Sequence, residues 1–259
     1  HCAELGFDGI DINMGCPAKS AVKSGGSALI RKPDLAIESI AAAKRAGLPV
    51  SVKTRLGYTS TDEWRDWLTT LLQQDIVALT IHLRTKKEMS KVPAHHELIP
   101  DIKKLRDQIA PQTLLIINGD IRDRAHGLEI VEKYGVDGIM IGRGIFHDPF
   151  AFRDAGEGAV GMIRTNPLQP ELNKAPVPLS SPERSRLSES SVVERINLLH
   201  YHLDLYDKYA EQTTRPYDTL KRFYKIYVRD FDGAAEIRDQ LMHTHSTDGV
   251  RKLLETNDR

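Results

Sequence analysis

Five groups of reactive or polar residues occur at regular intervals in the first 150 residues of the chain. They are Asn13/Cys16, Lys53/Arg55, His82/Arg84, Asn118/Asp120 and Gly142/Arg143. A free thiol is mostly protonated near neutral pH, so Cys16 can serve as a proton donor. Fixed positive charges stabilise developing anions, and glycines beside Arg143 offer backbone amides that can bind phosphate. The residue types therefore indicate that Cys16 can donate a proton, with charged and polar groups available beside it.

Each of these residues also has a structural explanation when it is taken alone. A lone cysteine is commonly a small buried hydrophobe. Lys53 and Arg55 could be rim charges paired with carboxylates, and His82 could be a hydrogen-bonded core histidine. Five such groups in succession, each directly after an apolar run, favour the functional interpretation.

The apolar runs that precede these groups predict strands over 9–13, 50–53, 78–82, 114–118 and 138–142. Helices are predicted from Pro33 to Gly47 and over 98–109 and 125–134. Strict alternation of strands and helices predicts a parallel sheet, which could be doubly wound or a (β/α)8 barrel. Because all five groups fall at carboxyl ends of strands, we favour the α/β TIM barrel. Five units are visible, so about three strands are expected to be missing upstream.

The chain changes in character after Phe152. Residues 154–190 are rich in glycine, proline and serine and predict a linker. Helical periodicity returns with a stripe formed by Val192, Ile196, Leu199, Leu203 and Tyr206. We therefore predict a partial barrel domain over 1–153, a linker over 154–190 and a small helical domain over 191–259.

The helical domain contains a basic and aromatic stretch that predicts RNA binding. Its cations are Arg215, Lys221, Arg222, Lys225 and Arg229, interleaved with Tyr217, Phe223, Tyr224 and Tyr227. If the stretch is helical, Lys221, Lys225 and Arg229 share one face that could bind phosphates, while the aromatic rings could stack on bases. The alternative is a solvated face over an aromatic core.

Composition excludes several other classes of protein. Lys+Arg and Asp+Glu both number 36, so no overall basicity advertises nucleic acid, although a local patch would suffice. Two cysteines fit a reducing cytoplasm rather than a disulfide framework. The sequence has no apolar run long enough for a membrane span. Pairs such as His95-His96 have no further ligand at a recognisable metal spacing, so no metal site is expected.

Five ordered motifs resemble those of the tRNA-dihydrouridine synthases. They are Asp-Ile-Asn-Met-Gly-Cys-Pro at 11–17, Val-Lys-Thr-Arg-Leu-Gly at 52–57, Ile-His-Leu-Arg-Thr at 81–85, Asn-Gly-Asp-Ile at 118–121 and Gly-Ile-Met-Ile-Gly-Arg-Gly at 138–144. The resemblance is close over residues 3–152 and looser over about the last 45 residues. It implies an FMN-dependent reduction of specific uridines in tRNA to dihydrouridine, with NADPH as reductant.

The resemblance also implies residue roles. Cys16 would protonate C5 of the uracil after hydride transfer to C6. Lys53 and His82 would lie against the flavin, with Arg84 nearby. The FMN phosphate would be held by Asn118, Gly119, Asp120, Gly142, Arg143 and Gly144. The tRNA would be contacted by Asn13, Arg55, Arg215, Lys221, Arg222, Lys225 and Arg229.

Two other functions are compatible with these residues. One is a different FMN barrel oxidoreductase acting on a small molecule, similar to dihydroorotate dehydrogenase. The other is a non-catalytic tRNA-binding remnant. We further expect a cytoplasmic monomer, and poor FMN binding without the upstream strands.

Overall fold

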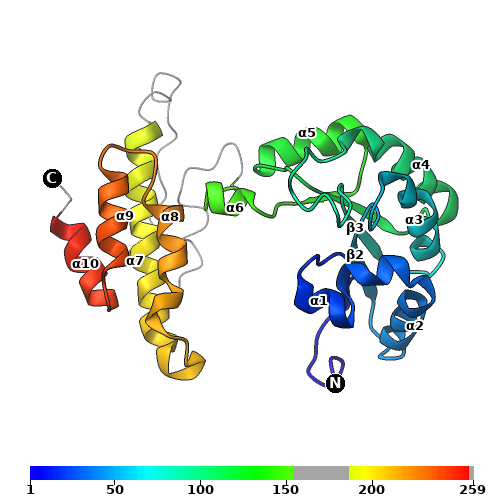
Figure 1. Cartoon of the computed structure of the whole chain (residues 1–259), viewed down its shortest axis with the longest axis horizontal. Helices are drawn as coiled ribbons and strands as arrows, with labels where there is room; N and C mark the ends of the chain where they lie inside the picture. Colours follow the sequence, from blue (N-terminus) through cyan, green and yellow to red (C-terminus); the bar gives the residue numbers. More distant parts are fainter. Residues whose placement is uncertain (154–186, 257–259) are drawn as a thin grey trace. The chain divides into compact units, whose positions relative to one another are not determined.

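The computed structural model describes residues 1–153 and 187–256, which form two compact units, His1–Gly144 and Ile145–Arg259 (Figure 1). Residues 154–186 of the predicted linker (154–190) lie outside the described residues. The first helix after it begins at Leu187, earlier than the predicted start of the helical domain at 191.

The first unit is built on a parallel sheet of five strands. These are β1 (Ile10–Asn13), β2 (Val50–Arg55), β3 (Ala78–His82), β4 (Leu114–Asn118) and β5 (Gly138–Met140). Their order in the sheet is β1-β2-β3-β4-β5, with every neighbouring pair parallel. The predicted strands and their pairing are confirmed. A doubly wound sheet would reverse its strand order at a switch point, and these five strands show no reversal. Closure into an eight-stranded barrel stays a prediction.

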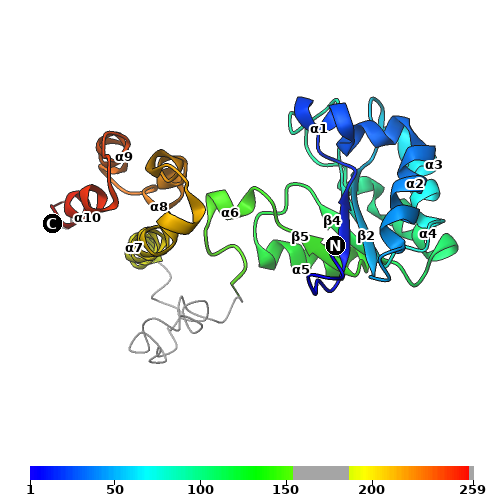
Figure 2. The ribbon, with the colours of Figure 1, turned by 90° about the horizontal axis from the view of Figure 1, so that it is seen from below.

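Helices connect consecutive strands, and the longer ones among them cover the outer face of the sheet (Figure 1). They are α1 (Lys19–Ser24), α2 (Pro33–Lys44), α3 (Trp64–Leu72), α4 (Ile99–Ile109) and α5 (Arg124–Tyr134), with short 3-10 turns at η1 (Gly26–Arg31), η2 (Thr61–Glu63) and η3 (His96–Leu98). Figures 1 and 2 show α2, α3 and α4 along the same outer side of the strands. The sheet residues that face them, including Val52, Leu79 and Ile117, are fully buried.

Local sequence explains where these helices begin and end. Pro33 starts α2 with its fixed φ, and Lys44 in the last turn suits the negative end of the helix dipole. Asp123 caps α5 by accepting a hydrogen bond from the backbone N–H of His126, and Gly135 ends the helix in the left-handed region. The residues that bury α3 are Trp64, Trp67, Leu68, Leu71 and Leu72.

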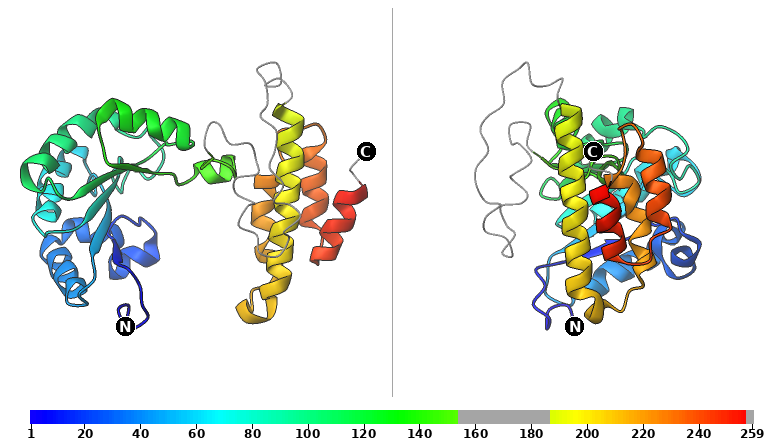
Figure 3. Two further views of the ribbon diagram at one scale, coloured as in Figure 1. Left: turned by 180° about the vertical axis from the view of Figure 1, so that it is seen from behind. Right: turned by 90° about the vertical axis from the view of Figure 1, so that its left-hand side faces the viewer.

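The second unit is helical. It comprises α7 (Leu187–Thr213), α8 (Tyr224–Tyr227), α9 (Ala234–Met242) and α10 (Thr247–Thr256), with 3-10 turns η7 (Tyr217–Thr219) and η8 (Lys221–Phe223), and it follows the short α6 (Gly144–His147). Figure 3 shows α8, α9 and α10 packed beside the long α7. Leu199 and Leu203 of the predicted stripe are buried in this core, and Ile196 and Tyr206 pack against it. None of the described helices combines the length and apolar character needed to cross a bilayer.

The basic and aromatic stretch does not form one helical face, so that expectation is wrong. Two 3-10 turns precede α8, and the helix stops at Tyr227 because Val228 leaves the helical region with φ −98° and ψ 88°. Arg229 therefore lies beyond the helix that carries Lys225. The buried residues of α8 are Tyr224, Ile226 and Tyr227, because the aromatic rings build the core of the unit.

Candidate active site at the carboxyl ends of the strands

The register of the sheet brings five of the predicted site residues of the first unit onto one face. Asn13 pairs with Lys53, and His82 pairs with both Arg55 and Asn118. Side chains of residues in register on parallel strands point to the same side, as do residues two apart on one strand. The five side chains therefore share the face opposite the covering helices, near the carboxyl ends of β1 to β4.

The turn that carries Cys16 is held from several directions. The Asn13 side-chain oxygen accepts hydrogen bonds from the backbone N–H groups of Gly15 (3.0 Å) and Cys16 (2.9 Å). The carbonyl of Cys16 accepts from the backbone N–H of Ser27 at 3.0 Å. A Cβ on Gly15 would lie 3.1 Å from the backbone of Thr54, so any larger residue would require the Thr54 backbone to shift by a few tenths of an ångström. The half-buried free thiol of Cys16 is thus fixed beside the polar face of the sheet.

Arg55 ties this turn to the loop after β3. Its Nε donates to the carbonyl of Gly15 (2.8 Å), and its Nη1 donates to the carbonyls of Thr85 and Met89 (3.1 Å each). The side chain is only 6% exposed. These bonds give Arg55 a positioning role between two loops. A contact with tRNA, predicted from the resemblance, would have to be made by its Nη2.

Arg84 is the centre of a buried polar network. It is 2% exposed and donates to the Val92 carbonyl (2.6 Å), to His82 Nε2 (3.2 Å) and to the Asp120 carboxylate (2.5 Å). A guanidinium has donors only, so His82 Nε2 must accept and the ring proton must sit on Nδ1. The Nδ1–H of His82 is therefore a hydrogen-bond donor that Arg84 does not use.

Two pKa values in this site are lowered. Burial, followed by the charges of Arg55 and Lys53, lowers the pKa of His82 to about 3, so the imidazole is neutral at physiological pH. Burial and the Arg55 charge also lower the pKa of Lys53. Ionisable groups with perturbed pKa values in a shared site are characteristic of functional centres. The neutral His82 imidazole, which can donate a hydrogen bond, and the Lys53 side chain therefore lie on one face of the sheet.

The ends of β4 and β5 form a glycine-rich edge next to this network. Gly119 has φ +125°, and a Cβ there would lie 3.0 Å from the Ala94 Cβ and 3.2 Å from His82 Cδ2. Asp120 accepts from Arg84, from the Ala94 N–H (2.9 Å) and from Arg143 (3.2 Å). Its carboxylate would repel a phosphate. We therefore assign the Asp120 side chain to orienting the two arginines, and the exposed Gly142 and Arg143 to anion binding.

His95 and His96, for which the sequence predicts no metal site, lie in this neighbourhood. His96 donates from Nε2 to the carbonyl of Gly119 at 2.8 Å. His95 bridges Glu88 and Glu97; burial lowers the pKa of His95, but the hydrogen bonds to the two carboxylates outweigh it and raise the pKa. The Gly119 carbonyl reaches His96 from the end of β4, and no spacing in the sequence predicts that contact. Within the described residues, no group of three or more His, Cys, Asp or Glu side chains is arranged to hold a metal ion.

The cations predicted to bind tRNA in the second unit differ in their surroundings. Lys221 forms an ion pair with Asp218 (2.8 Å), and Arg222 stacks over Phe223. Arg229 pairs with Asp230 (2.6 Å) and donates to the carbonyl of His147. Arg215 and Lys225 are exposed. Lys221, Lys225 and Arg229 therefore do not form the single row that one helix would have given.

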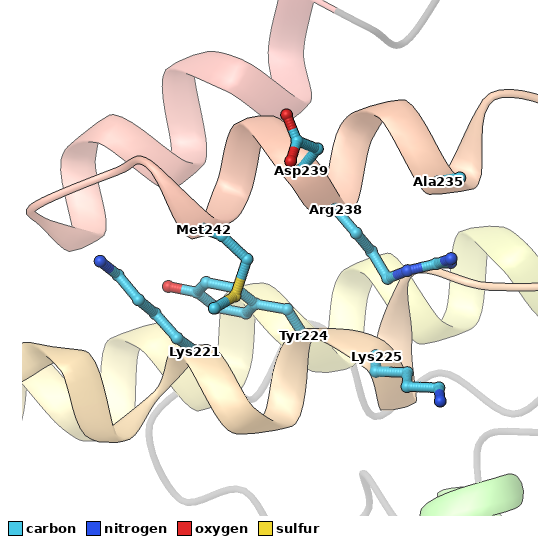
Figure 4. Close-up of a pocket in the computed structure, with 7 residues that line it drawn as sticks. All are labelled: Lys221, Tyr224, Lys225, Ala235, Arg238, Asp239 and Met242. Atoms are coloured by element: carbon cyan, nitrogen blue, oxygen red, sulfur yellow. The ribbon is translucent and has the colours of Figure 1, made fainter.

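A pocket of about 310 Å³ opens between η8/α8 and α9. Figure 4 shows the side chains that line it, which come from Lys221, Tyr224, Lys225, Ala235, Arg238, Asp239 and Met242. Arg238 was not among the predicted site residues, and its Nη1 donates to the carbonyl of Val228 at 2.9 Å. Three cations and one carboxylate around a partly apolar floor suit an anionic ligand with an apolar part.

Comparison with known proteins decides the family. The dihydrouridine synthase family model matches residues 1–258. The chain belongs to the dihydrouridine synthase family. It is 55% identical to a probable tRNA-dihydrouridine synthase 2 of Bacillus subtilis over 258 residues, which cover 99% of this chain and 70% of the relative.

Two further relatives agree. A probable tRNA-dihydrouridine synthase of Staphylococcus epidermidis is 53% identical over 98% of this chain and 69% of its own length. Another of Staphylococcus aureus is 52% identical over 98% of this chain and 68% of its own length. The suspected resemblance to the dihydrouridine synthases is therefore confirmed, and with it the interpretation of the sheet as part of that family's α/β fold followed by helices.

Proposed function

We propose that this dihydrouridine synthase family member reduces uridines in tRNA to 5,6-dihydrouridine, with FMN as cofactor and NADPH as electron source. This would make it an oxidoreductase acting on a CH–CH bond. The names of its relatives support the tRNA substrate. The observation that carries the proposal is the placement of the Cys16 turn beside a sheet face that presents Lys53 and a neutral His82.

The reaction adds a hydride and a proton across the C5–C6 double bond of uracil. FMN, when bound and reduced, supplies the hydride to C6. Cys16 donates its thiol proton to C5. Its backbone N–H donates to the Asn13 side-chain oxygen and its carbonyl accepts from the Ser27 N–H, and these bonds hold the backbone that carries the thiol. The side-chain oxygen of Asn13 accepts the hydrogen bonds of this turn, so its NH₂ group can donate to the substrate.

The residues present fit FMN at the other side of the site. Gly119 and Gly144 occupy positions where a side chain would collide with neighbouring atoms, and Arg143 projects an exposed guanidinium. Loops after the last two strands of a barrel commonly bind phosphate. We assign Gly142, Arg143 and the backbone of Asn118, Gly119 and Gly144 to the phosphate. Lys53 and the Nδ1–H of His82 would contact the flavin ring, where a fixed cation stabilises the anionic reduced form.

We propose that the helical unit binds tRNA, as its basic pocket favours. Lys221, Lys225 and Arg238 can neutralise phosphates, and Met242 offers an apolar contact to a base. Arg215 and Arg222 are the other exposed cations proposed for this surface. We retain the assignment of residues 1–153 to the catalytic domain and of the helices after the linker to tRNA binding. A cytoplasmic location, which the two unpaired cysteines favour, and a monomeric state are proposed as well.

The experiment that tests this function is spectroscopic. The protein, as its gene encodes it, is purified, and its visible spectrum is followed on adding NADPH and then unmodified tRNA. We expect a flavin band that bleaches with NADPH and returns with tRNA. In Cys16→Ala, bleaching should persist while reoxidation by tRNA slows by about 10²-fold or more, the usual contribution of a general acid.

Cys2→Ala is the matched control, because Cys2 is the other free cysteine and is exposed. A colourless protein that still binds tRNA would instead support a non-catalytic RNA-binding protein. Bleaching without any response to tRNA would support an oxidoreductase for a small molecule.

A further inference from the structure

Two cations share one aromatic ring on the carboxyl-end rim of the first unit. The Arg31 guanidinium lies 5.1 Å and the Lys86 ammonium 4.8 Å from the centre of the Tyr58 ring. Arg31 ends the segment after β1, Tyr58 follows β2 and Lys86 follows β3. Three successive loops thus contribute to one basic group, which we call the Tyr58 cluster (Arg31, Tyr58 and Lys86).

Within the described residues, the two cations of the Tyr58 cluster are not neutralised by a direct ion pair. Arg31 is exposed and Lys86 half-buried, and neither forms an ion pair with a carboxylate within the described residues. Glu63 is the nearby acid, and the charge of Arg31 contributes to its lowered pKa. The oxygens of Glu63 are already occupied by the backbone N–H groups of residues 58–60, at 2.7, 3.0 and 2.8 Å. The cations therefore remain available to an external anion.

The backbone around the Tyr58 cluster is preorganised. The hydrogen bonds to Glu63 fix the loop that carries Tyr58, and Ser60 caps the following turn. Lys86 N–H donates to the Gly57 carbonyl, and Lys87 N–H donates to the Tyr58 carbonyl, at 2.9 Å each. These bonds hold the loops after β2 and β3 together, so binding an anion would require little ordering of the backbone.

The Tyr58 cluster lies close to Cys16. Ser27 contacts the Cys16 carbonyl at 3.0 Å, and Arg31 comes four residues later in the same 3-10 segment, roughly 8 Å along it. The proposed FMN phosphate site is elsewhere: β2 and β5 are separated by three strand spacings, roughly 14 Å. An anion at the Tyr58 cluster is therefore a different one from the cofactor phosphate.

We infer that the Tyr58 cluster binds the sugar-phosphate backbone of the RNA strand that presents its uridine to Cys16. The inference rests on the proposed tRNA substrate and adds a phosphate contact supplied by the catalytic unit itself. Arg31 offers a planar fork that matches a phosphate, Lys86 adds a point charge, and Tyr58 keeps both in place. Backbone contacts of this kind position a nucleic acid without reading its sequence.

The test is the salt dependence of tRNA binding, measured by fluorescence anisotropy with an unmodified tRNA transcript at increasing KCl. The log of the tRNA affinity falls as the log of the salt concentration rises, and Arg31→Gln and Lys86→Gln should each make this slope shallower by about 0.7–0.9. The apparent KM for tRNA should rise severalfold, while the rate of flavin reduction by NADPH stays unchanged. Arg31→Lys should restore part of the affinity, because it keeps the charge but loses the fork.

Lys104→Gln is the matched control, since Lys104 is an exposed lysine on α4 of the same unit. The inference would be overturned if the slopes of Arg31→Gln and Lys86→Gln equal the wild-type slope, or if they change no more than the slope of Lys104→Gln. It would also be overturned if the wild-type protein does not bind tRNA. Dihydrouridine formation by the wild type is scored separately. Reduced slopes without dihydrouridine would support RNA binding by the Tyr58 cluster and refute the proposed function. Dihydrouridine formation with unchanged slopes would support the proposed function and refute RNA binding by the Tyr58 cluster.

Discussion

Replacing Arg84 by methionine tests whether the network beneath the candidate active site depends on this one buried cation. Methionine keeps an unbranched apolar chain but removes every donor. The change leaves the Val92 carbonyl and His82 Nε2 without the hydrogen bonds that Arg84 provides. It also removes the main counter-charge of Asp120, for which burial would otherwise raise the pKa.

The expected cost follows from burial and from what Asp120 keeps. Removing one partner of a buried ion pair commonly destabilises a protein by about 3–5 kcal/mol. Asp120 is 34% exposed and retains Arg143 at 3.2 Å and the Ala94 N–H at 2.9 Å. The lower end, about 3 kcal/mol, is therefore expected. With a urea m-value of about 2 kcal/mol per M, the unfolding midpoint falls by about 1.5 M.

Tryptophan fluorescence is a suitable assay because it reports on one unit. The sequence has two tryptophans, Trp64 and Trp67, and both are buried in α3 of the first unit. Urea unfolding followed by their emission therefore measures the stability of the unit that contains Arg84. Circular dichroism at 222 nm on the same samples reports the second unit as well.

Arg143→Met is the matched control. Arg143 also pairs with Asp120, but its side chain is 62% exposed, so its loss should cost at most about 1 kcal/mol. The reasoning is refuted if Arg84→Met is no more destabilising than Arg143→Met. The double variant Arg84→Met with Asp120→Asn should recover part of the loss, because it no longer leaves a carboxylate without its main cation.

Two further predictions concern stability. Because the pKa of His82 is lowered to about 3 in the folded state, the unfolded state binds a proton that the folded state excludes as pH falls below about 6.5. Urea unfolding between pH 7 and 4.5 should show the free energy of unfolding decreasing by up to ~1.4 kcal/mol per pH unit, and by less where solvent screens the site. His82→Gln should make this pH dependence flatter. An equally steep dependence in His82→Gln would contradict the assignment of the effect to His82. Gly119→Ala should cost about 1–3 kcal/mol more than Gly47→Ala, because a Cβ at Gly119 would meet Ala94 and His82 whereas one at Gly47 would meet nothing within 4 Å; equal costs in the same assay would refute the close approach.

Sequence by itself determined the local elements of the first unit and the groups that follow them. Periodicity and turn residues predicted all five strands, and helices close to α2, α4 and α5, because hydrophobic spacing and caps act over a few residues. The same spacing placed Cys16, Lys53 and His82 at strand ends, and their motifs indicated the family.

Tertiary structure decided how the groups are used. The order of the strands, which excludes a doubly wound arrangement of these five, follows from pairing between segments far apart in the chain. Arginines are mostly exposed in folded proteins, yet Arg55 and Arg84 are both buried because distant loops bring carbonyls and a carboxylate to them. Such contacts have no periodicity to read.

The basic and aromatic stretch shows the same limit. Its composition suggested one helical face. Its tyrosines and Phe223 instead pack in the core formed with α7, α9 and α10, and the helix ends because Val228 leaves the helical conformation. Arg238 joins Lys221 and Lys225 at the pocket only because α9 packs against α8. Residue types are local information, whereas the side chains that meet across helices and loops depend on packing.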